Sequence, residues 1–155
     1  MIILEGIDGT GKTTVADYLN QNGYSTYHFT YDKKNKNIED KYVSLLDEET
    51  QNMVLDRSFV SELVYGPVLR HSCKLNREQL EKILTRYKQV NPIVLYFKAN
   101  KEDILQRRIK DEKDYQMLTI NYDALNNRYE KVIRVISKYL NVIEINTSER
   151  SVENK

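Results

Sequence analysis

The stretch ILEGIDGTGKTT, residues 3–14, decides the fold because three glycines and a lysine follow directly on a short apolar run. Glycine loses more conformational freedom on folding than any other residue, so this density indicates that the backbone approaches something closely. The stretch fits the pattern G-x-x-x-x-G-K-[ST], with the following residues in the fixed positions: Gly6, Gly11, Lys12 and Thr13. This pattern is typical of loops that cradle phosphate groups.

The chemistry of such a loop follows from its place between a strand and a helix. Backbone N–H groups of the loop point at one anion, and the helix that begins near Lys12 adds its positive end. The lysine reaches the β- and γ-phosphates, and the hydroxyl of Thr13 binds Mg²⁺. A chance match is the alternative, with odds well under ~1% because glycine makes up about 7% of typical composition. The sequence therefore predicts binding of a nucleoside triphosphate. We expect four further residues of this stretch to contact the nucleotide: Asp8, Gly9, Thr10 and Thr14.

Length and composition exclude several classes of protein. A chain of 155 residues predicts one domain. With 24 basic and 23 acidic residues the net charge is +1, so no overall field favours nucleic acid or a membrane as partner. The single cysteine, Cys73, cannot form an internal disulfide, which favours a reducing, cytoplasmic setting. No signal peptide is visible, and no apolar run approaches the roughly 20 residues that cross a bilayer.

Apolar runs alternate with helical patterns along the whole chain. Strands are expected at 2–5, 24–30, 53–56, 93–97 and 142–145, and the polar stretch 31–40 is expected to form an exposed loop. Because the strands are nearly continuously apolar, they favour a parallel sheet with helices on both faces, a three-layer α/β/α arrangement.

Helices are expected at 12–22, around 43–46, between a capping box at Asn76 and Gln79 and a break at Asn91, and at about 101–110 and 121–140. The first of these should end at Gly23. It should place Val15, Tyr18 and Leu19 together on one apolar face.

Two motifs together resemble the thymidylate kinase family of nucleoside-monophosphate kinases. That family carries an aspartate in its phosphate loop, matched here by Asp8. After its third strand it carries D-R-[aromatic]-x-x-S-x-x-A-Y-Q, matched within DRSFVSELVYG by Asp56, Arg57, Ser61 and Tyr65. The later stretches 93–108, 122–133 and 142–153 resemble the family's fourth strand and lid-side helix, the helix after its lid, and its closing strand with the base-side loop. The resemblance therefore covers nearly the whole chain in order.

The resemblance implies a fold and a reaction. It implies a five-stranded parallel sheet of order 2-3-1-4-5 in one domain over 1–155, with a short lid around 107–116. It further implies transfer of a phosphoryl group from ATP, with Mg²⁺, to a nucleoside monophosphate, most naturally dTMP or a related deoxynucleotide. A small-molecule acceptor and a homodimer are the implied partners.

The resemblance also assigns roles to individual residues. The implied catalytic residues are Lys12, Asp56, Arg57 and Arg108. The implied ligands of Mg²⁺ are Thr13 and Asp56. Acceptor binding falls to Asp8, Arg57, Ser61, Tyr65 and Arg70, the last standing five residues beyond the tyrosine. Thr147, in the base-side loop, would contact the nucleotide donor. Either Arg107 or Arg108 would bring a cation from the lid to the transferred group.

Plain structural roles stay open for several of these residues. Asp56 could cap the end of a strand, Tyr65 could be packed in the core, and Arg70 could be an ordinary surface arginine. The cations near residues 107–113 could simply complement the end of a helix. For His28, Cys73 and the lysines at 33, 34 and 36 we expect structural roles only.

Departures from the family pattern leave the acceptor open. The stretch FTYDKKNK, 29–36, stands where bacterial members have R-E-P-G-G, and RRIKDEKDY lacks the usual D-R-[FY]-E of the lid. Ser58 replaces the aromatic residue, which is closer to the E-R-S of deoxynucleoside kinases. A deoxynucleoside kinase is therefore the alternative enzyme.

A GTPase-like switch is the alternative of a different class. NKED, 100–103, matches N-K-x-D, and TSER, 147–150, stands where such proteins bind guanine. Against it, no D-x-x-G follows the third strand, and Asn100 is explained as a helix cap closed by Asp103. A nucleic-acid end kinase would need a basic stripe, which the sequence lacks.

Overall fold

The computed structural model describes residues 1–30, 34 and 37–148 and shows one parallel sheet. Its strands are β1 (Ile2–Gly6), β2 (Ser25–His28), β3 (Met53–Asp56), β4 (Ile93–Lys98) and β5 (Asn141–Asn146). All neighbouring pairs are parallel, in the order β2-β3-β1-β4-β5. The expected strand order is confirmed. The expected loop over 31–40 is wrong at its end, because residues 38–40 belong to a helix. Residues 31–33 and 35–36 of this loop, and 149–150 of the stretch 147–150, lie outside the described residues.

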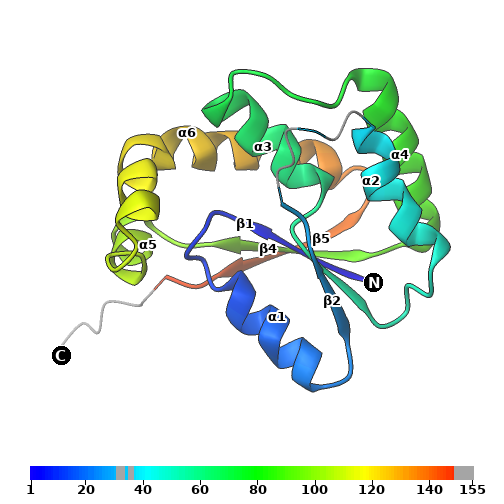
Figure 1. Cartoon of the computed structure of the whole chain (residues 1–155), viewed down its shortest axis with the longest axis horizontal. Coiled ribbons are helices and arrows are strands. Elements are labelled where there is room, and N and C mark those ends of the chain that lie inside the picture. The colour runs from blue at the N-terminus through cyan, green and yellow to red at the C-terminus, as the bar shows by residue number, and fades with distance from the viewer. Residues whose placement is uncertain (31–33, 35–36, 149–155) are drawn as a thin grey trace.

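Helices lie on both faces of the sheet (Figure 1). They are α1 (Lys12–Gln21), α2 (Ile38–Val43) with the 3-10 turn η1 (Ser44–Asp47), α3 (Phe59–Leu69), α4 (Arg77–Val90), α5 (Lys101–Arg107) and α6 (Glu112–Ile136). One face carries α2, α3, α4 and α6, over the larger core cluster. The other carries α1, over a smaller cluster of Leu4, Ala16, Val54 and Phe97. The three-layer arrangement is thereby confirmed.

The inner face of α1 differs from the expected one. Tyr18 is 65% exposed, whereas Lys12 and Ala16 are buried. Because the side chain of Lys12 points inward to the phosphate loop, the inner face follows residues four apart from position 12 and leaves Tyr18 outside. The expectation for Tyr18 was therefore wrong, and Gly23 does follow the helix with a φ of 92°.

The segment after β4 also differs from the expected one. α5 ends at Arg107, and α6 begins at Glu112 rather than near 121. The carboxylate of Asp111 accepts a hydrogen bond from the N–H of Asp114, 3.1 Å away, and so caps α6 at this earlier position. The connection between the two helices is consequently the short turn 108–111, and residues 112–116 of the expected lid form the start of α6.

Helix ends elsewhere follow the sequence signals. Asn76 and Gln79 form the expected capping box, and Asn91 ends α4 in a left-handed conformation with a φ of 54°. Asn100 caps α5 by accepting from the N–H of Asp103 at 2.9 Å. Within the described residues, no helix is long and apolar enough to cross a membrane.

Candidate active site

The phosphate loop connects β1 to α1 at the carboxyl edge of the sheet. Gly6 has a φ of 146°, and a Cβ there would lie 2.4 Å from the carbonyl oxygen of Phe97, so the position requires glycine. Gly11 adopts a left-handed conformation with a φ of 98° directly before α1. The loop therefore turns sharply into the N-terminus of a helix, the geometry that binds phosphate.

Lys12 is folded back onto this loop. Its Nζ donates to the carbonyl oxygens of Gly6 at 2.7 Å and Ile7 at 3.0 Å, and the residue is 5% exposed. Burial, together with the nearby charge of Arg57, lowers the pKa of Lys12 to about 7. A phosphate bound in the loop would favour the protonated, charged form of Lys12, and this charge would in turn stabilise the phosphate.

A cavity of about 550 Å³ opens over the phosphate loop. Its lining includes nearly all residues that the sequence assigns to the donor nucleotide and to catalysis: Asp8, Gly9, Thr10, Gly11, Lys12, Thr13, Thr14, Asp56, Arg57, Arg108 and Thr147. Gly6 shapes the turn beneath it. Residues from the ends of β1, β3, β5 and α5 thus line one cavity, and their roles in it stay predictions.

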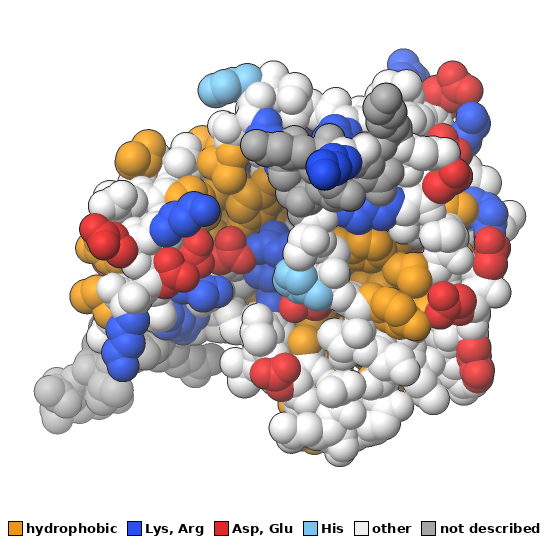
Figure 2. Space-filling view, in the orientation of Figure 1, with side chains coloured by type: hydrophobic (Ala, Val, Ile, Leu, Met, Phe, Trp, Pro, Cys, Tyr) orange, Lys and Arg blue, Asp and Glu red, His pale blue; other side chains and the backbone are white. Residues whose placement is uncertain are grey.

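A second cavity of about 350 Å³ lies between β2, α2 and α3. It is lined by four residues that the sequence assigns to the acceptor, Asp8, Arg57, Ser61 and Tyr65. Further lining residues are His28, Phe29, Thr30, Ile38, Lys41, Tyr42, Ser58, Glu62 and Lys74. Figure 2 shows basic side chains in the hollow of this face, next to apolar side chains and a histidine.

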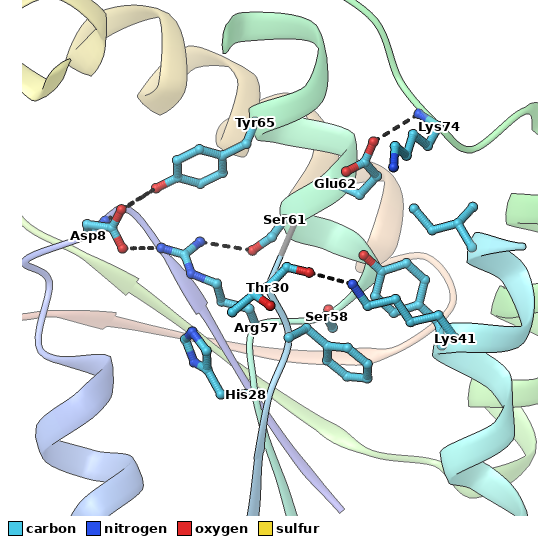
Figure 3. A pocket seen from close by; sticks show the side chains of 13 residues that line it. Asp8, His28, Thr30, Lys41, Arg57, Ser58, Ser61, Glu62, Tyr65 and Lys74 are labelled. Atoms are coloured by element: carbon cyan, nitrogen blue, oxygen red, sulfur yellow. Dashed lines mark hydrogen bonds and ion pairs between the residues drawn. The ribbon is translucent and has the colours of Figure 1, made fainter. Parts of the chain in front are cut away.

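Arg57 lies between the two cavities. Its backbone has a φ of 74°, which is unfavourable for a residue with a side chain. Its Nη2 contacts Oδ1 of Asp8, and its Nη1 donates to Oγ of Ser61 at 3.1 Å (Figure 3). The guanidinium also lies 4.8 Å from the ring centroid of Tyr65.

Arg57 and Asp8 stabilise one another in their charged forms. Burial would raise the pKa of Asp8, but Arg57 and Lys12 hold it below its ordinary value. Burial would likewise lower the pKa of Arg57, yet nearby groups that include Asp8 and Glu5 raise it. Both side chains are therefore charged, and Arg57 presents a fixed cation to each cavity.

Asp56 and His28 face each other at the ends of β3 and β2. Oδ2 of Asp56 lies 3.0 Å from Nδ1 of His28, and Asp56 is 7% exposed. Sequence reasoning assigned His28 a structural role only, but it lines both cavities, as do Asp8 and Arg57. The sequence did offer one signal for His28, because it is a polar residue at the carboxyl end of a strand, where ligands bind in parallel sheets.

The lid-side arginines lie over the outer side of the phosphate loop. Arg107 donates through Nη1 to the carbonyl oxygen of Gly9 at 3.1 Å and to Oγ1 of Thr147 at 3.2 Å. A Cβ on Gly9 would lie 3.3 Å from Cγ of Arg108, whose buried Nε has no partner among the described residues. Its Nη1 is 3.7 Å from Asp114. Both arginines line the phosphate-loop cavity.

Arg70 is placed apart from the other predicted acceptor residues. It lines neither of these two cavities, and its Nη2 donates to Oε2 of Glu62 at 2.5 Å. Glu62 is 6% exposed and lines the second cavity, and its Oε1 accepts from the N–H of Lys74 at 2.9 Å. Arg70 therefore contacts a residue that lines the acceptor cavity, and its own contact with a phosphate stays a prediction.

Glu5 is the functional candidate that sequence reasoning missed. It is fully buried at the end of β1, beside Gly6. A carboxylate within an otherwise apolar strand was the available signal, because a buried charge requires partners.

Comparison with known proteins agrees with this geometry. The protein named "Putative thymidylate kinase" from Acidianus bottle-shaped virus (isolate Italy/Pozzuoli) is 34% identical over 92 residues. The match covers 53% of this chain and 59% of that protein, so the chain spans less than two thirds of this relative's length. No family model matches the sequence.

Solved structures decide the fold. The YorR protein of Bacillus subtilis, in complex with phosphorylated GDP, superposes with a TM-score of 0.77 over 94% of this chain and 85% of its own, at 25% identity. The chain has the fold of the P-loop nucleotide kinases. Thymidylate kinase from Candida albicans shares this kinase fold, with a TM-score of 0.55 over 96% of this chain and 84% of its own, at 14% identity. The resemblance to thymidylate kinases is thereby confirmed.

Proposed function

We propose that this chain transfers the γ-phosphoryl group of ATP, with Mg²⁺, to a nucleoside monophosphate, dTMP or a related deoxynucleotide. One observation carries the proposal: the phosphate-loop cavity and the second cavity adjoin, and both are lined by Asp8, His28 and Arg57. A phosphoryl group that passes between two bound nucleotides needs such a junction, flanked by cations.

The donor nucleotide would lie in the phosphate-loop cavity. The N–H groups of the loop and the N-terminus of α1 would hold its phosphates, with Lys12 against the transferred group. Arg107 and Thr147, which are hydrogen-bonded to each other, would border its base. Closure of the 107–116 segment would bring Arg108 onto the transferred group, a role supported by its buried Nε, which has no hydrogen-bond partner in the described part of the chain.

The chemistry of the donor set fits Mg²⁺. The hydroxyl of Thr13 and the carboxylate of Asp56 both line the phosphate-loop cavity, and Mg²⁺ prefers such oxygen ligands together with phosphates and water. The described residues contain no cluster of three or more His, Cys, Asp or Glu side chains that could hold a metal by themselves. Bound there, the ion would neutralise charge on the phosphates.

The acceptor would lie in the second cavity. Its phosphate would meet the guanidinium of Arg57, whose planar fork binds phosphate oxygens in pairs. Phe29 and Tyr42, with ring centroids 5.1 Å apart, offer apolar faces for a base on the opposite side of the cavity. Asp56, at the end of β3, would order a Mg²⁺-bound water or accept the proton of the acceptor.

The deciding experiment offers the protein ATP and Mg²⁺ together with a panel of nucleosides and nucleoside monophosphates. We expect phosphorylation of a pyrimidine deoxynucleoside monophosphate, detected by separation of the labelled diphosphate. Binding of GTP alone, with slow hydrolysis and no phosphorylated acceptor, would instead identify a nucleotide switch.

A deoxynucleoside kinase is the second candidate, favoured by Ser58. This residue caps α3 and bonds to Glu5, in the position where thymidylate kinases carry an aromatic residue. The same panel separates the two candidates, because a nucleoside acceptor yields a monophosphate and has no phosphate for Arg57 to bind.

A further inference from the structure

We infer that Glu5 is a positioning residue that fixes the guanidinium of Arg57 and joins the phosphate loop, the β3–α3 turn and α6. The inference rests on the proposed function, in which Arg57 binds the phosphate of the acceptor. Glu5 lines neither the phosphate-loop cavity nor the second cavity, so it acts through Arg57.

The carboxylate of Glu5 is fully buried and accepts five hydrogen bonds. Its Oε1 accepts from the N–H of Ser58 at 2.7 Å, from Oγ of Ser58 at 2.8 Å and from the N–H of Ser61 at 3.2 Å. Its Oε2 accepts from Oγ of Ser61 at 2.8 Å and from the hydroxyl of Tyr129 at 3.0 Å. The carboxylate thus covers the N-terminus of α3, where a negative charge is favoured.

This arrangement reaches Arg57 through Ser61. The hydroxyl of Ser61 has one hydrogen, which it donates to Glu5, so its oxygen is left to accept from Nη1 of Arg57 at 3.1 Å. The backbone N–H of Arg57 also donates to the carbonyl oxygen of Leu4, 3.0 Å away. Since the left-handed backbone of Arg57 is unfavourable by itself, these contacts must hold it in place.

A second connection runs through Tyr129 on α6. Its hydroxyl lies 3.0 Å from Glu5 and 3.2 Å from the carbonyl oxygen of Gly6 in the phosphate loop. Burial, together with the charge of Glu5, raises the pKa of Tyr129, which keeps the hydroxyl protonated as a donor. The ring of Tyr129 also meets the edge of Tyr65, whose face lies against Arg57.

Glu5 therefore meets three parts of the site that must be aligned for transfer. They are the loop that holds the donor, the turn that carries Arg57, and the helix that begins at the lid segment. Loss of the charge of Glu5, or of one group that donates a hydrogen bond to it, should let the guanidinium of Arg57 move. The backbone of the phosphate loop should keep its geometry.

The test uses Tyr129→Phe, which removes one donor to Glu5 and keeps the ring, and Glu5→Gln, which removes the charge. We expect each variant to raise the acceptor KM by roughly tenfold, the equivalent of one charged hydrogen bond, and to leave the Kd of MgATP within about twofold of the wild type. Ser61→Ala should act in the same way, and Ser61→Thr, which retains the hydroxyl, should restore the wild-type KM.

Tyr96→Phe is the matched control. Tyr96 stacks on Tyr129 with ring centroids 5.6 Å apart, but its hydroxyl bonds to Glu130 at 3.3 Å and not to Glu5. This variant loses a tyrosine hydroxyl from the same stack, so it should leave the acceptor KM unchanged.

A readout that needs no turnover is the nuclear magnetic resonance signal of the Arg57 guanidinium, identified by its loss in Arg57→Lys. A fixed guanidinium gives separate Nη signals, and Tyr129→Phe and Glu5→Gln should merge them. If both variants lower only the Tm and preserve the acceptor KM and these signals, Glu5 is a packing residue and the inference is wrong. If the wild type phosphorylates no monophosphate, the proposed function fails, and the Arg57 signals still decide the role of Glu5. Should Glu5→Gln not fold, Tyr129→Phe decides it, because Tyr129 lines neither cavity.

Discussion

Arg57 and Asp8 face each other where the two cavities meet, with Nη2 of the guanidinium against Oδ1 of the carboxylate. The contact joins the turn after β3 to the phosphate loop across 49 residues of sequence. An acceptor phosphate would share Arg57 with Asp8, so the carboxylate both orients the cation and competes for it.

Replacement of Lys12 tests the donor site. Lys12→Ala should lower kcat by at least roughly 10²–10³-fold, because it removes the cation nearest the transferred group. Lys88→Ala, on the exposed side of α4, is the control and should be fully active. A steady-state assay at saturating substrates measures the effect, and near-normal turnover of Lys12→Ala would contradict the proposed donor site.

Charge reversal at Arg57 tests the acceptor site. Arg57→Glu should abolish phosphorylation of a monophosphate and leave the affinity for ATP nearly unchanged, because the acceptor phosphate depends on this fork, whereas the loop N–H groups and Lys12 hold the phosphates of ATP. Arg77→Glu, at an exposed position of α4, is the control. Should nucleosides prove the better substrates and Arg57 prove dispensable for them, the enzyme is a deoxynucleoside kinase.

The lid-side arginines should separate by kinetic parameter. Arg108→Ala should lower kcat, since its cation would reach the transferred group only during transfer, while both KM values change little. Arg107→Ala should instead raise the KM for ATP, because Arg107 bonds to Gly9 and Thr147 beside the donor. Equal effects of the two variants on both parameters would show that neither arginine has a separate role.

The pair of Asp8 and Arg57 predicts a pH dependence of stability. The pKa of Asp8 in the folded state lies below the ordinary value of 3.8. Its contribution is therefore fully present above pH 3.8 and is lost as the pH falls through the lower folded-state value. Asp8→Asn should cost about 1.5–3 kcal/mol of the free energy of unfolding near pH 7. Denaturant titrations should show this difference shrinking in strong acid, and a constant difference would exclude the ion pair as its source.

Arg70 tests a structural against a substrate role. Arg70→Ala removes a cation that is paired with the buried carboxylate of Glu62, so the free energy of unfolding should fall by about 3–5 kcal/mol. The double variant Arg70→Ala, Glu62→Gln should recover part of this loss, because the buried charge is gone. A roughly tenfold or larger rise in the acceptor KM of Arg70→Ala, at unchanged stability, would instead place Arg70 directly on the substrate.

The fold and the residues of the phosphate loop could be predicted from the amino-acid sequence. The spacing of Gly6, Gly11, Lys12 and Thr13 requires a strand before it and a helix after it, so local geometry alone predicts the loop. The apolar strands and the helix caps at Asn76 and Asn100 could also be predicted, because each depends only on residues that are close in the sequence.

The tertiary structure alone decided which side chains meet across long separations. Glu5 and Tyr129 are 124 residues apart, and no periodic pattern reports their hydrogen bond. The engagement of Arg70 with Glu62, the place of His28 between the cavities, and the exposed Tyr18 likewise depend on how the elements pack. A buried charge requires partners, but the sequence does not say which ones, because packing brings them together only in the folded chain.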